Sequence, residues 1–466
     1  MHSMKKSLSL FIATVVLVSS VSTSGFAKEQ PPTGATPKAF QVPATESFSL
    51  ENGLKVTFIP YGKTPKTTIR LISTTGNIDD GELPWLADIS YQMLRQGTKT
   101  ESAKAIAERV ASMGGQINSS VGMDVSWLGV DVLSEYGSDA LTVIADMVLN
   151  PALSDTDLAR IKTDQARNLN VQLSQPGNLA NQAFYKAIYA NHPYGSLYPT
   201  EASLKSIERA DISGFVNENI RPNNSHLYIS GVFNQAKLTA TIKSVLSTWQ
   251  KGESKPSKAV LSQSGPKLIM LERENSPQST IRLGLATISP DHPDYMKLSM
   301  MNTLLGGAFS SRITSNIRES KGYTYSPYSA LVNRIGTGLW YQAADITIES
   351  TGAALTEIFN EIALLAKEPP SADELAGIQN YLAGIFVLQN SSRSAVISQL
   401  SYVERYNLTE QYLQDYVKSV YEVTPEEISQ MVKKYLTPEN MVLVTVGDKE
   451  VLTPQLKAVE ALEGYW

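Results

Sequence analysis

The sequence contains two copies of one pattern, and this duplication constrains the fold more than any single motif. Three pairs of segments match in the same order at an interval of about 216 residues. The pairs are 127–141 with 340–355, 154–161 with 371–378, and 212–224 with 428–440. Because chance does not place three matches in order at one interval, we infer that one unit was duplicated.

Each copy has the pattern of a strand, a helix, a strand, paired strands, further helices and a last strand. The segment 48–60 is predicted to be a hairpin, since Asn52-Gly53 stands between alternating apolar runs. Helical spacing of apolar residues follows in each copy, and Ser154 and Ser371 are predicted N-caps. The fold class is therefore predicted as α+β: two homologous domains from an internal duplication, each an antiparallel-rich β-sheet with helices packed on one face.

The junction between the copies is marked by composition. Lys, Ser, Pro and Gly dominate 251–264, and this segment is predicted to be a linker. The N-terminal domain is then expected at 45–250 and the C-terminal domain at 265–466. Residues 28–44 are interpreted as an N-terminal tail.

Residues 1–27 have the layout of a cleaved signal peptide. Lys5 and Lys6 precede an apolar run of about a dozen residues, which ends at the small residues Gly25 and Ala27. We therefore expect export to the periplasm. No later stretch approaches the roughly 18 apolar residues of a membrane-spanning helix, so no stable membrane insertion is expected.

Composition narrows the functions further. The chain has no cysteine, which excludes a disulfide, a thiolate metal site and a cysteine nucleophile. Its net charge of -5 is mild, and its charges are interspersed, so a nucleic-acid partner is not expected. A self-sufficient hydrolase with another nucleophile has little support, because the chain has no GxSxG and no clear His–Ser–Asp set.

Several motifs, taken in order, resemble the insulinase/pitrilysin-type metallopeptidases. They are the hairpin LENGLKVTFIP, the stretch 82–120, VLNP at 148–151, HPYG at 192–195, RPNN at 221–224, and LLGGAFSSRITSNIRESKGYTYS at 304–326. The likeness covers nearly the whole chain after the signal segment. It is greatest for the short two-domain branch that includes mitochondrial processing peptidase and bacterial relatives.

The resemblance implies a zinc site that this sequence lacks. Active members bind zinc with HxxEH on a helix and a distal Glu about 76 residues further on. Here the corresponding stretch reads DISYQ, so Asp88 and Gln92 replace the two His and Tyr91 replaces the general-base Glu. Arg167 or Asn168 stands where the distal Glu belongs.

We therefore expect no metal ligands and no bound cofactor in this chain, with zinc in a partner subunit. The helix around DISYQ is interpreted as a packing element with the apolar stripe Leu86, Ile89, Met93 and Leu94. His192, His226 and His292 are scattered singly, and His192 and His292, each before a Pro, are expected to be structural or surface residues.

The second half keeps a pair that the resemblance makes functional. In the family, an Arg and a Tyr seven residues later position the substrate carbonyl and stabilise the oxyanion; Arg318 and Tyr325 match these positions. The alternative is that Arg318 makes a surface ion pair and Tyr325 is core. Tyr323 is expected to be a packing residue. Gly306 and Gly307 are predicted to contact substrate, with a simple turn as the alternative.

The resemblance thus implies a non-catalytic subunit of a periplasmic heteromeric zinc endopeptidase, inactive alone. Arg318 and Tyr325 would act in trans, at the zinc of a homologous HxxEH-bearing catalytic subunit, on peptides or unfolded proteins. The alternative is a catalytically inactive paralogue that serves as a peptide-binding or assembly scaffold.

Overall fold

The computed structural model describes residues 41–253, 260, 262 and 265–466. The predicted signal peptide 1–27, most of the tail 28–44 and most of the linker 251–264 lie outside the described residues. The domain boundaries at 250 and 265 therefore stay predictions.

The first half of the chain forms a six-stranded sheet with the strand order β1-β2-β6-β3-β5-β4. Its strands are β1 (Glu46–Ser49), β2 (Lys55–Pro60), β3 (Lys66–Ser73), β4 (Gln116–Val121), β5 (Ser126–Leu133) and β6 (Ser225–Gly231). Its helices are α2 (Leu86–Leu94), α3 (Ala103–Ser112), α4 (Gly137–Leu149), α5 (Asp155–Ser174), α6 (Pro176–Tyr189), α7 (Glu201–Ser206), α8 (Arg209–Asn219) and α9 (Gln235–Leu246).

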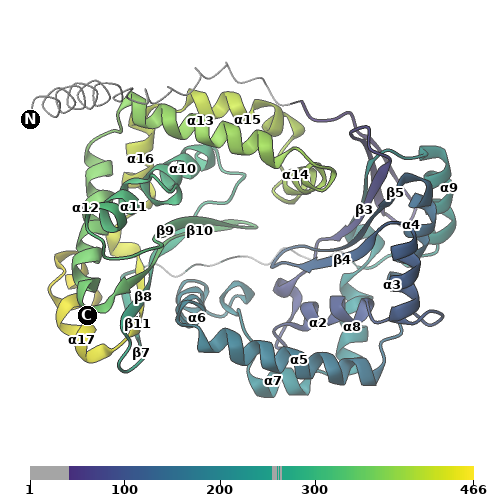
Figure 1. Cartoon of the computed structure of the whole chain (residues 1–466), viewed down its shortest axis with the longest axis horizontal. Coiled ribbons are helices and arrows are strands. Elements are labelled where there is room, and N and C mark those ends of the chain that lie inside the picture. The colour runs from purple at the N-terminus through teal and green to yellow at the C-terminus, as the bar shows by residue number, and fades with distance from the viewer. Residues whose placement is uncertain (1–40, 254–259, 261, 263–264) are drawn as a thin grey trace, which may run out of the picture. The chain divides into compact units, whose positions relative to one another are not determined.

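The second half forms a five-stranded sheet with the order β7-β11-β8-β10-β9 (Figure 1). Its strands are β7 (Lys267–Glu272), β8 (Gln278–Thr287), β9 (Tyr328–Arg334), β10 (Thr337–Thr347) and β11 (Val442–Gly447). Its helices are α10 (Tyr295–Asn302), α11 (Arg312–Thr314), α12 (Thr351–Lys367), α13 (Ala372–Gln389), α14 (Arg393–Arg405), α15 (Glu410–Glu422), α16 (Pro425–Tyr435) and α17 (Lys449–Lys457).

The two sheets have the same topology once β1 is set aside. In each, the last strand runs parallel to the first, and the remaining pairs are antiparallel. A cross-strand bond is repeated as well: Thr68 donates to Asp131 at 2.9 Å, and Thr280 donates to Asp345 at 2.5 Å. The α+β fold of two duplicated domains is thus as the sequence predicts.

Local predictions are also confirmed. Strands β1 and β2 pair antiparallel around the Asn52-Gly53 turn, with Ser49 opposite Lys55, and Gly53 has the positive φ of 91° that this turn requires. Ser154 and Ser371 cap α5 and α13 by accepting a hydrogen bond from the backbone N–H three residues later.

Each sheet also packs against a helix from the other half, so helices do not cover one face alone, contrary to the sequence-based prediction. Helix α6 lies on the second sheet, where Phe184 belongs to one buried cluster with Val442 and Val444 of β11. Helix α14 lies on the first sheet, where Ile397 and Leu400 cluster with β-strand residues such as Ile72. The two helices begin 217 residues apart, at 176 and 393, so this exchange repeats with the duplication.

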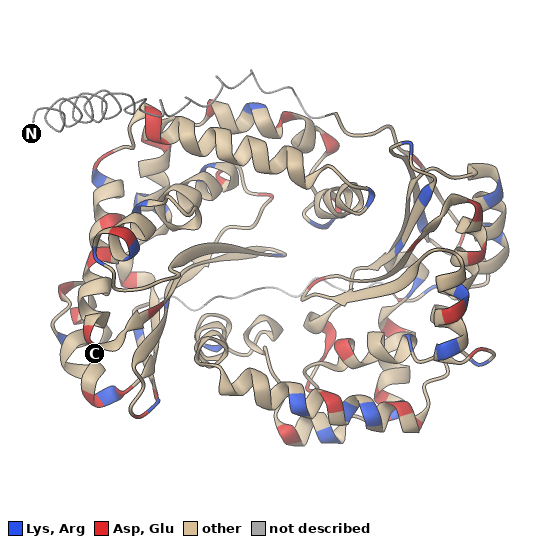
Figure 2. Ribbon diagram, in the orientation of Figure 1, with Lys and Arg blue, Asp and Glu red and all other residues tan. Residues whose placement is uncertain are grey.

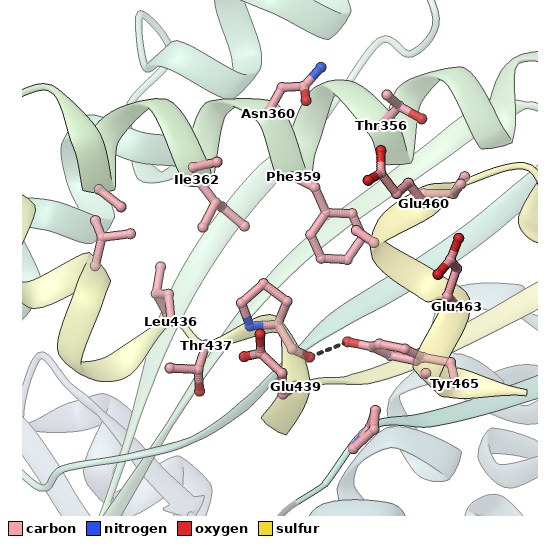
Figure 3. A pocket seen from close by; sticks show the side chains of 18 of the residues that line it. Thr356, Phe359, Asn360, Ile362, Leu436, Thr437, Glu439, Glu460, Glu463 and Tyr465 are labelled. Atoms are coloured by element: carbon pink, nitrogen blue, oxygen red, sulfur yellow. Dashed lines mark hydrogen bonds between the residues drawn. The ribbon is translucent and has the colours of Figure 1, made fainter.

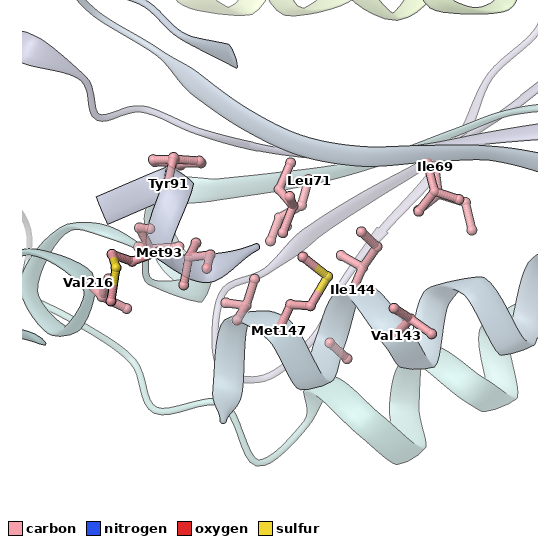
Figure 4. Close-up of a cluster of buried hydrophobic side chains, with 14 of the residues drawn as sticks. Ile69, Leu71, Tyr91, Met93, Val143, Ile144, Met147 and Val216 are labelled. Atoms are coloured by element: carbon pink, nitrogen blue, oxygen red, sulfur yellow. The ribbon is translucent and has the colours of Figure 1, made fainter. Parts of the chain in front are cut away.

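The core of the first half lies between its sheet and its own helices. Figure 4 shows Leu71 of β3, Tyr91 and Met93 of α2, and Met147 of α4 within one buried cluster. All four residues of the predicted α2 stripe are buried. Helix α2 is therefore a packing element, as its apolar spacing indicates.

Charges are interspersed along the outer helices. Helix α5 carries both acidic and basic residues (Figure 2), and Arg160 pairs with both Asp157 and Asp164. In the described part of the chain, no helix is long and apolar enough to cross a membrane.

Candidate functional site

Helix α2 corresponds to the zinc-binding helix of the family, but other residues stand at the ligand and general-base positions. Tyr91, in the place of the general base, is fully buried, and burial raises the pKa of its phenol. A buried neutral phenol cannot activate a water molecule at neutral pH.

Asp88, in the place of the first His, belongs to a small hydrogen-bonded cluster. Asn77 Nδ2 donates to Asp88 Oδ2 at 2.6 Å and to Asp80 Oδ2 at 3.0 Å. Asp80 also accepts from the backbone N–H groups of Trp85 and Ala87, each at 2.8 Å, and so caps the start of α2. Burial raises the pKa of Asp88 and that of Asp80, the latter to about 7. The Asn77 amide thus binds both carboxyl groups, and Asp80 binds the backbone at the start of α2.

The position of the distal Glu faces solvent. The side chain of Arg167 is 73% exposed and pairs with Asp164 on its own helix at 3.0 Å. Within 41–253, 260, 262 and 265–466, no group of three or more His, Cys, Asp or Glu side chains is arranged to hold a metal ion. The residues present therefore do not fit the zinc that the resemblance implies for active members.

The histidines have structural roles. His192 and His292 each accept a hydrogen bond at Nδ1 from the backbone N–H two residues later. His226 contacts Glu404 through Nδ1 at 2.7 Å and Thr57 through Nε2 at 2.8 Å. These bonds agree with the expectation that His192 and His292 are structural or surface residues.

Two π-helical turns carry the Arg/Tyr region. Thr303–Gly307 holds the glycines and Ser315–Ser320 holds Arg318. Such turns are rare and occur frequently at functional sites. The second turn is anchored to α12, because Asn316 Nδ2 donates to Glu357 at 3.0 Å and to Glu361 at 2.7 Å.

A further anchor holds α11, just before this turn. The guanidinium of Arg312 donates to both carboxylate oxygens of Glu374, at 2.7 and 2.8 Å, and these bonds raise the pKa of Arg312. A bidentate pair fixes direction as well as distance. The backbone that carries Arg318 is therefore held from α12 and from α13.

All four predicted residues of the second half line one cavity. The cavity has a volume of about 370 Å³, and Gly306, Gly307, Arg318 and Tyr325 are among its lining residues. The Tyr325 side chain is 81% exposed and makes no hydrogen bond to the described part of the chain, so it is not a core residue. Tyr323 packs against the core of the second half, as predicted.

Arg318 lies between two aromatic rings of this cavity. Its Cζ is 4.2 Å from the ring centroid of Phe309 and 5.2 Å from that of Tyr325. Its Nε also lies 3.4 Å from Glu319, so the ion pair of the alternative interpretation exists. Glu319 is exposed, and such a pair stabilises little in water.

Gly306 and Gly307 are closely packed against neighbouring side chains. A Cβ on Gly306 would lie 2.6 Å from Ser329 Oγ and 2.7 Å from Gln342 Oε1, and a Cβ on Gly307 would lie 2.8 Å from Asn302 Nδ2. Neither glycine has a positive φ. Both glycines lie in the π-helical turn Thr303–Gly307, so the predicted substrate contact and the turn alternative both stay open.

The sequence analysis missed Phe309. Its side chain is 73% exposed, although it is a large apolar residue in contact with a cation of the site. The available signal was its place as the single large apolar residue in the run GGAFSS at 306–311.

A second cavity of about 710 Å³ lies elsewhere in the second half, between α12, α16 and the C-terminal turn. Its floor is apolar and includes Phe359 and Ile362, and Glu439, Glu460 and Glu463 stand around it (Figure 3). Tyr465 closes one side by donating to the carbonyl of Pro438 at 2.6 Å. It contains none of the predicted site residues.

A duplicated α+β fold with a lost zinc motif and an Arg/Tyr pair in the lining of one cavity defines a metallopeptidase-like chain. Comparison with known proteins gives the same class. Residues 59–199 match the family described as insulinase (peptidase family M16), and residues 206–382 match the peptidase M16 inactive domain. The chain belongs to the insulinase family.

Similar proteins include an uncharacterized zinc protease, YmxG, of Bacillus subtilis. It is 25% identical over 363 residues, which cover 76% of this chain and 86% of the relative. An uncharacterized zinc protease of Mycobacterium bovis, Mb2805c, is 24% identical over 427 residues, which cover 89% of this chain and 97% of the relative.

Solved structures show the same fold. A peptidase M16 inactive domain from Pseudomonas fluorescens has a TM-score of 0.79 and 26% identity, and the match covers 87% of this chain and 98% of that one. A protease from Helicobacter pylori has a TM-score of 0.80 at 18% identity, with 87% of this chain and 100% of that one covered.

Proposed function

We propose that this chain is the non-catalytic subunit of a periplasmic heteromeric zinc endopeptidase. It lends Arg318 and Tyr325 to the zinc site of a homologous, HxxEH-bearing partner that cleaves peptides or unfolded proteins. The periplasmic location rests on the signal-like residues 1–27.

The observation that carries this proposal is the placement of two hydrogen-bond donors, Arg318 and Tyr325, in the lining of one cavity. The Tyr325 hydroxyl makes no hydrogen bond to the described residues, and Arg318 pairs with the exposed Glu319 at 3.4 Å, while the turn that carries Arg318 is anchored through Asn316. A held cation and a neutral O–H donor are suited to an oxygen on which negative charge develops. Because the described residues hold no ligand set for zinc, the reacting carbonyl would have to be presented by another subunit.

The chemistry assigned to this chain is limited to orientation and charge stabilisation. The Tyr325 hydroxyl would donate to the carbonyl oxygen of the scissile peptide, and the fork of Arg318 would fix the neighbouring peptide group. No proton is abstracted here, because the described residues that line the cavity include no carboxylate and no imidazole. The chain alone is then inactive.

The test is reconstitution with an HxxEH-bearing partner. Tyr325→Phe removes one donor and keeps the ring, so we expect assembly to survive and turnover to fall by about 10²–10³-fold. Arg318→Lys keeps the charge but loses the fork, and is also expected to impair cleavage. Tyr381→Phe, at an exposed tyrosine of α13, is the matched control and should cleave at the wild-type rate.

Complex size is measured by gel filtration before peptide hydrolysis is assayed. If Tyr325→Phe and Arg318→Lys both assemble and cleave at wild-type rates, the pair is structural. An obligate complex without peptidase activity would instead favour the alternative, an inactive paralogue that serves as a peptide-binding or assembly scaffold.

A further inference from the structure

Exposed aromatic rings surround the Arg318 cavity. Phe309 is 73% exposed, Tyr325 81% and Tyr328 44%, and all three line the same hollow together with Pro327. Contiguous exposed apolar groups are uncommon on proteins that have no partner there, and they mark interaction sites. A volume of about 370 Å³ is within the range of pockets that bind small ligands.

The charge of this cavity is unusual for a peptide site. Arg318 is the one charged residue among the described residues that line it, and Glu319 lies outside the lining. A basic side chain entering the cavity would therefore meet the Arg318 cation directly, because Glu319, 3.4 Å from Arg318 Nε, stands outside the lining.

The aromatic rings do not compensate for the repulsion between Arg318 and a basic ligand side chain. A Lys or Arg of a ligand could in principle stack on a ring face, but Arg318 already lies over Phe309 and Tyr325. An uncharged aromatic side chain meets no such obstacle. It gains from the rings and from Pro327 by apolar burial and by edge-to-face contact.

The neighbouring backbone is suited to an extended ligand. Tyr328 opens β9, which is the terminal strand of its sheet and is hydrogen-bonded on one side to β10. The ring of Tyr328 is itself held by an edge-on contact with Tyr341, at a centroid distance of 6.0 Å. An extended peptide beside Tyr328 thus has a strand edge available for pairing.

We propose that the Phe309–Arg318–Tyr325–Tyr328 cavity binds a bulky, uncharged side chain of an extended peptide, aromatic above all, and rejects a basic one. Phe309 is the specificity-determining residue. This names the substrate class of the proposed function and rests on it, but peptide binding by the chain alone does not require the partner.

The experiment measures binding to the purified chain by fluorescence anisotropy. The probes are fluorescein-labelled decapeptides of Gly, Ser and Thr with blocked ends and one central Phe, Lys or Glu. We expect the Phe peptide to bind about tenfold more tightly than the Lys peptide. Phe309→Ala should weaken the Phe peptide about tenfold and leave the Lys peptide unchanged, and Phe309→Leu should restore part of the loss.

Tyr381→Ala is the control, because Tyr381 is an exposed aromatic residue (49%) outside this cavity. Circular dichroism checks that each variant is folded, which is expected because Phe309 is exposed. The proposal is overturned if the Lys peptide binds as tightly as the Phe peptide. It is also overturned if Phe309→Ala keeps the preference, or if the Phe peptide shows no binding up to about 1 mM.

The outcomes separate this inference from the proposed function. A Phe preference in the isolated chain, with cleavage by the reconstituted complex unaffected by Tyr325→Phe, supports the binding site and rejects the catalytic role. Loss of turnover in Tyr325→Phe without any side-chain preference supports the catalytic role and rejects the specificity of Phe309.

Discussion

Replacing Glu404 with Gln tests how firmly the two halves are joined. Glu404, on α14 of the second half, receives three contacts from strands of the first half. Lys55 Nζ lies 2.7 Å from Oε1, and His226 Nδ1 and Tyr228 Oη lie 2.7 and 2.8 Å from Oε2. Because an ionised carboxylate only accepts, all three groups donate to it.

The magnitude follows from the pKa of the carboxyl. Burial by itself raises the pKa of Glu404, but the hydrogen bond and charge of His226 and the bonds from Lys55 and Tyr228 outweigh it and lower the pKa to about 2. A fall from 4.5 corresponds to about 3.4 kcal/mol at pH 7. The side chain is 36% exposed, so screening by water reduces this, and we expect Glu404→Gln to cost about 1–2 kcal/mol.

The sign of the pH dependence is set by the same shift. Because the folded pKa lies below the unfolded one, the stabilisation is fully present above about pH 5 and is lost as the pH falls from about 4.5 to about 2. The wild type and Glu404→Gln should therefore converge as the pH is lowered.

The assay is urea unfolding from about pH 7 down to about pH 3, followed by fluorescence. Glu422→Gln removes an exposed partner of Lys418 on α15 and is the matched control, expected to change the free energy of unfolding by less than about 0.5 kcal/mol. A Glu404→Gln effect no larger than the control at neutral pH, or one that is equal at every pH, would refute the reasoning.

Three further outcomes are expected. Gly306→Ala should lower stability by about 1–3 kcal/mol in thermal unfolding, because the added Cβ would lie 2.6 Å from Ser329 Oγ and 2.7 Å from Gln342 Oε1; an unchanged melting temperature would contradict this. Ser371→Ala should cost about 1 kcal/mol in urea unfolding, since it removes the N-cap of α13, whereas Ser371→Asp should not. Asp88→Asn should be neutral or stabilising at about pH 7 and should lose any gain near pH 4. Burial raises the pKa of Asp88, so the folded state loses stability as the carboxyl ionises with rising pH. Melting temperatures measured across this pH range check the prediction.

Features that depend on short-range patterns were predictable from the sequence. The hairpin at Asn52-Gly53 and the caps Ser154 and Ser371 each involve residues a few positions apart, whose geometry the local chain dictates. The loss of the zinc ligands at Asp88 and Gln92 could also be predicted from the sequence, because metal binding depends on the chemical identity of side chains. The duplication could be predicted as well, because it is seen by comparing residue identities along the sequence.

Tertiary packing decides which side chains come together in the Arg318 cavity. Phe309 and Arg318 stand nine residues apart and their side chains are in contact. The segment that carries Arg318 is held by Glu361 and Glu374, which lie far along the chain. The exchange of α6 and α14 between the sheets was equally invisible. Both helices are amphipathic. An apolar stripe predicts that one face of a helix is buried, but it does not predict which sheet covers that face. Apolar burial is non-directional, so its partner is chosen only when the whole chain packs.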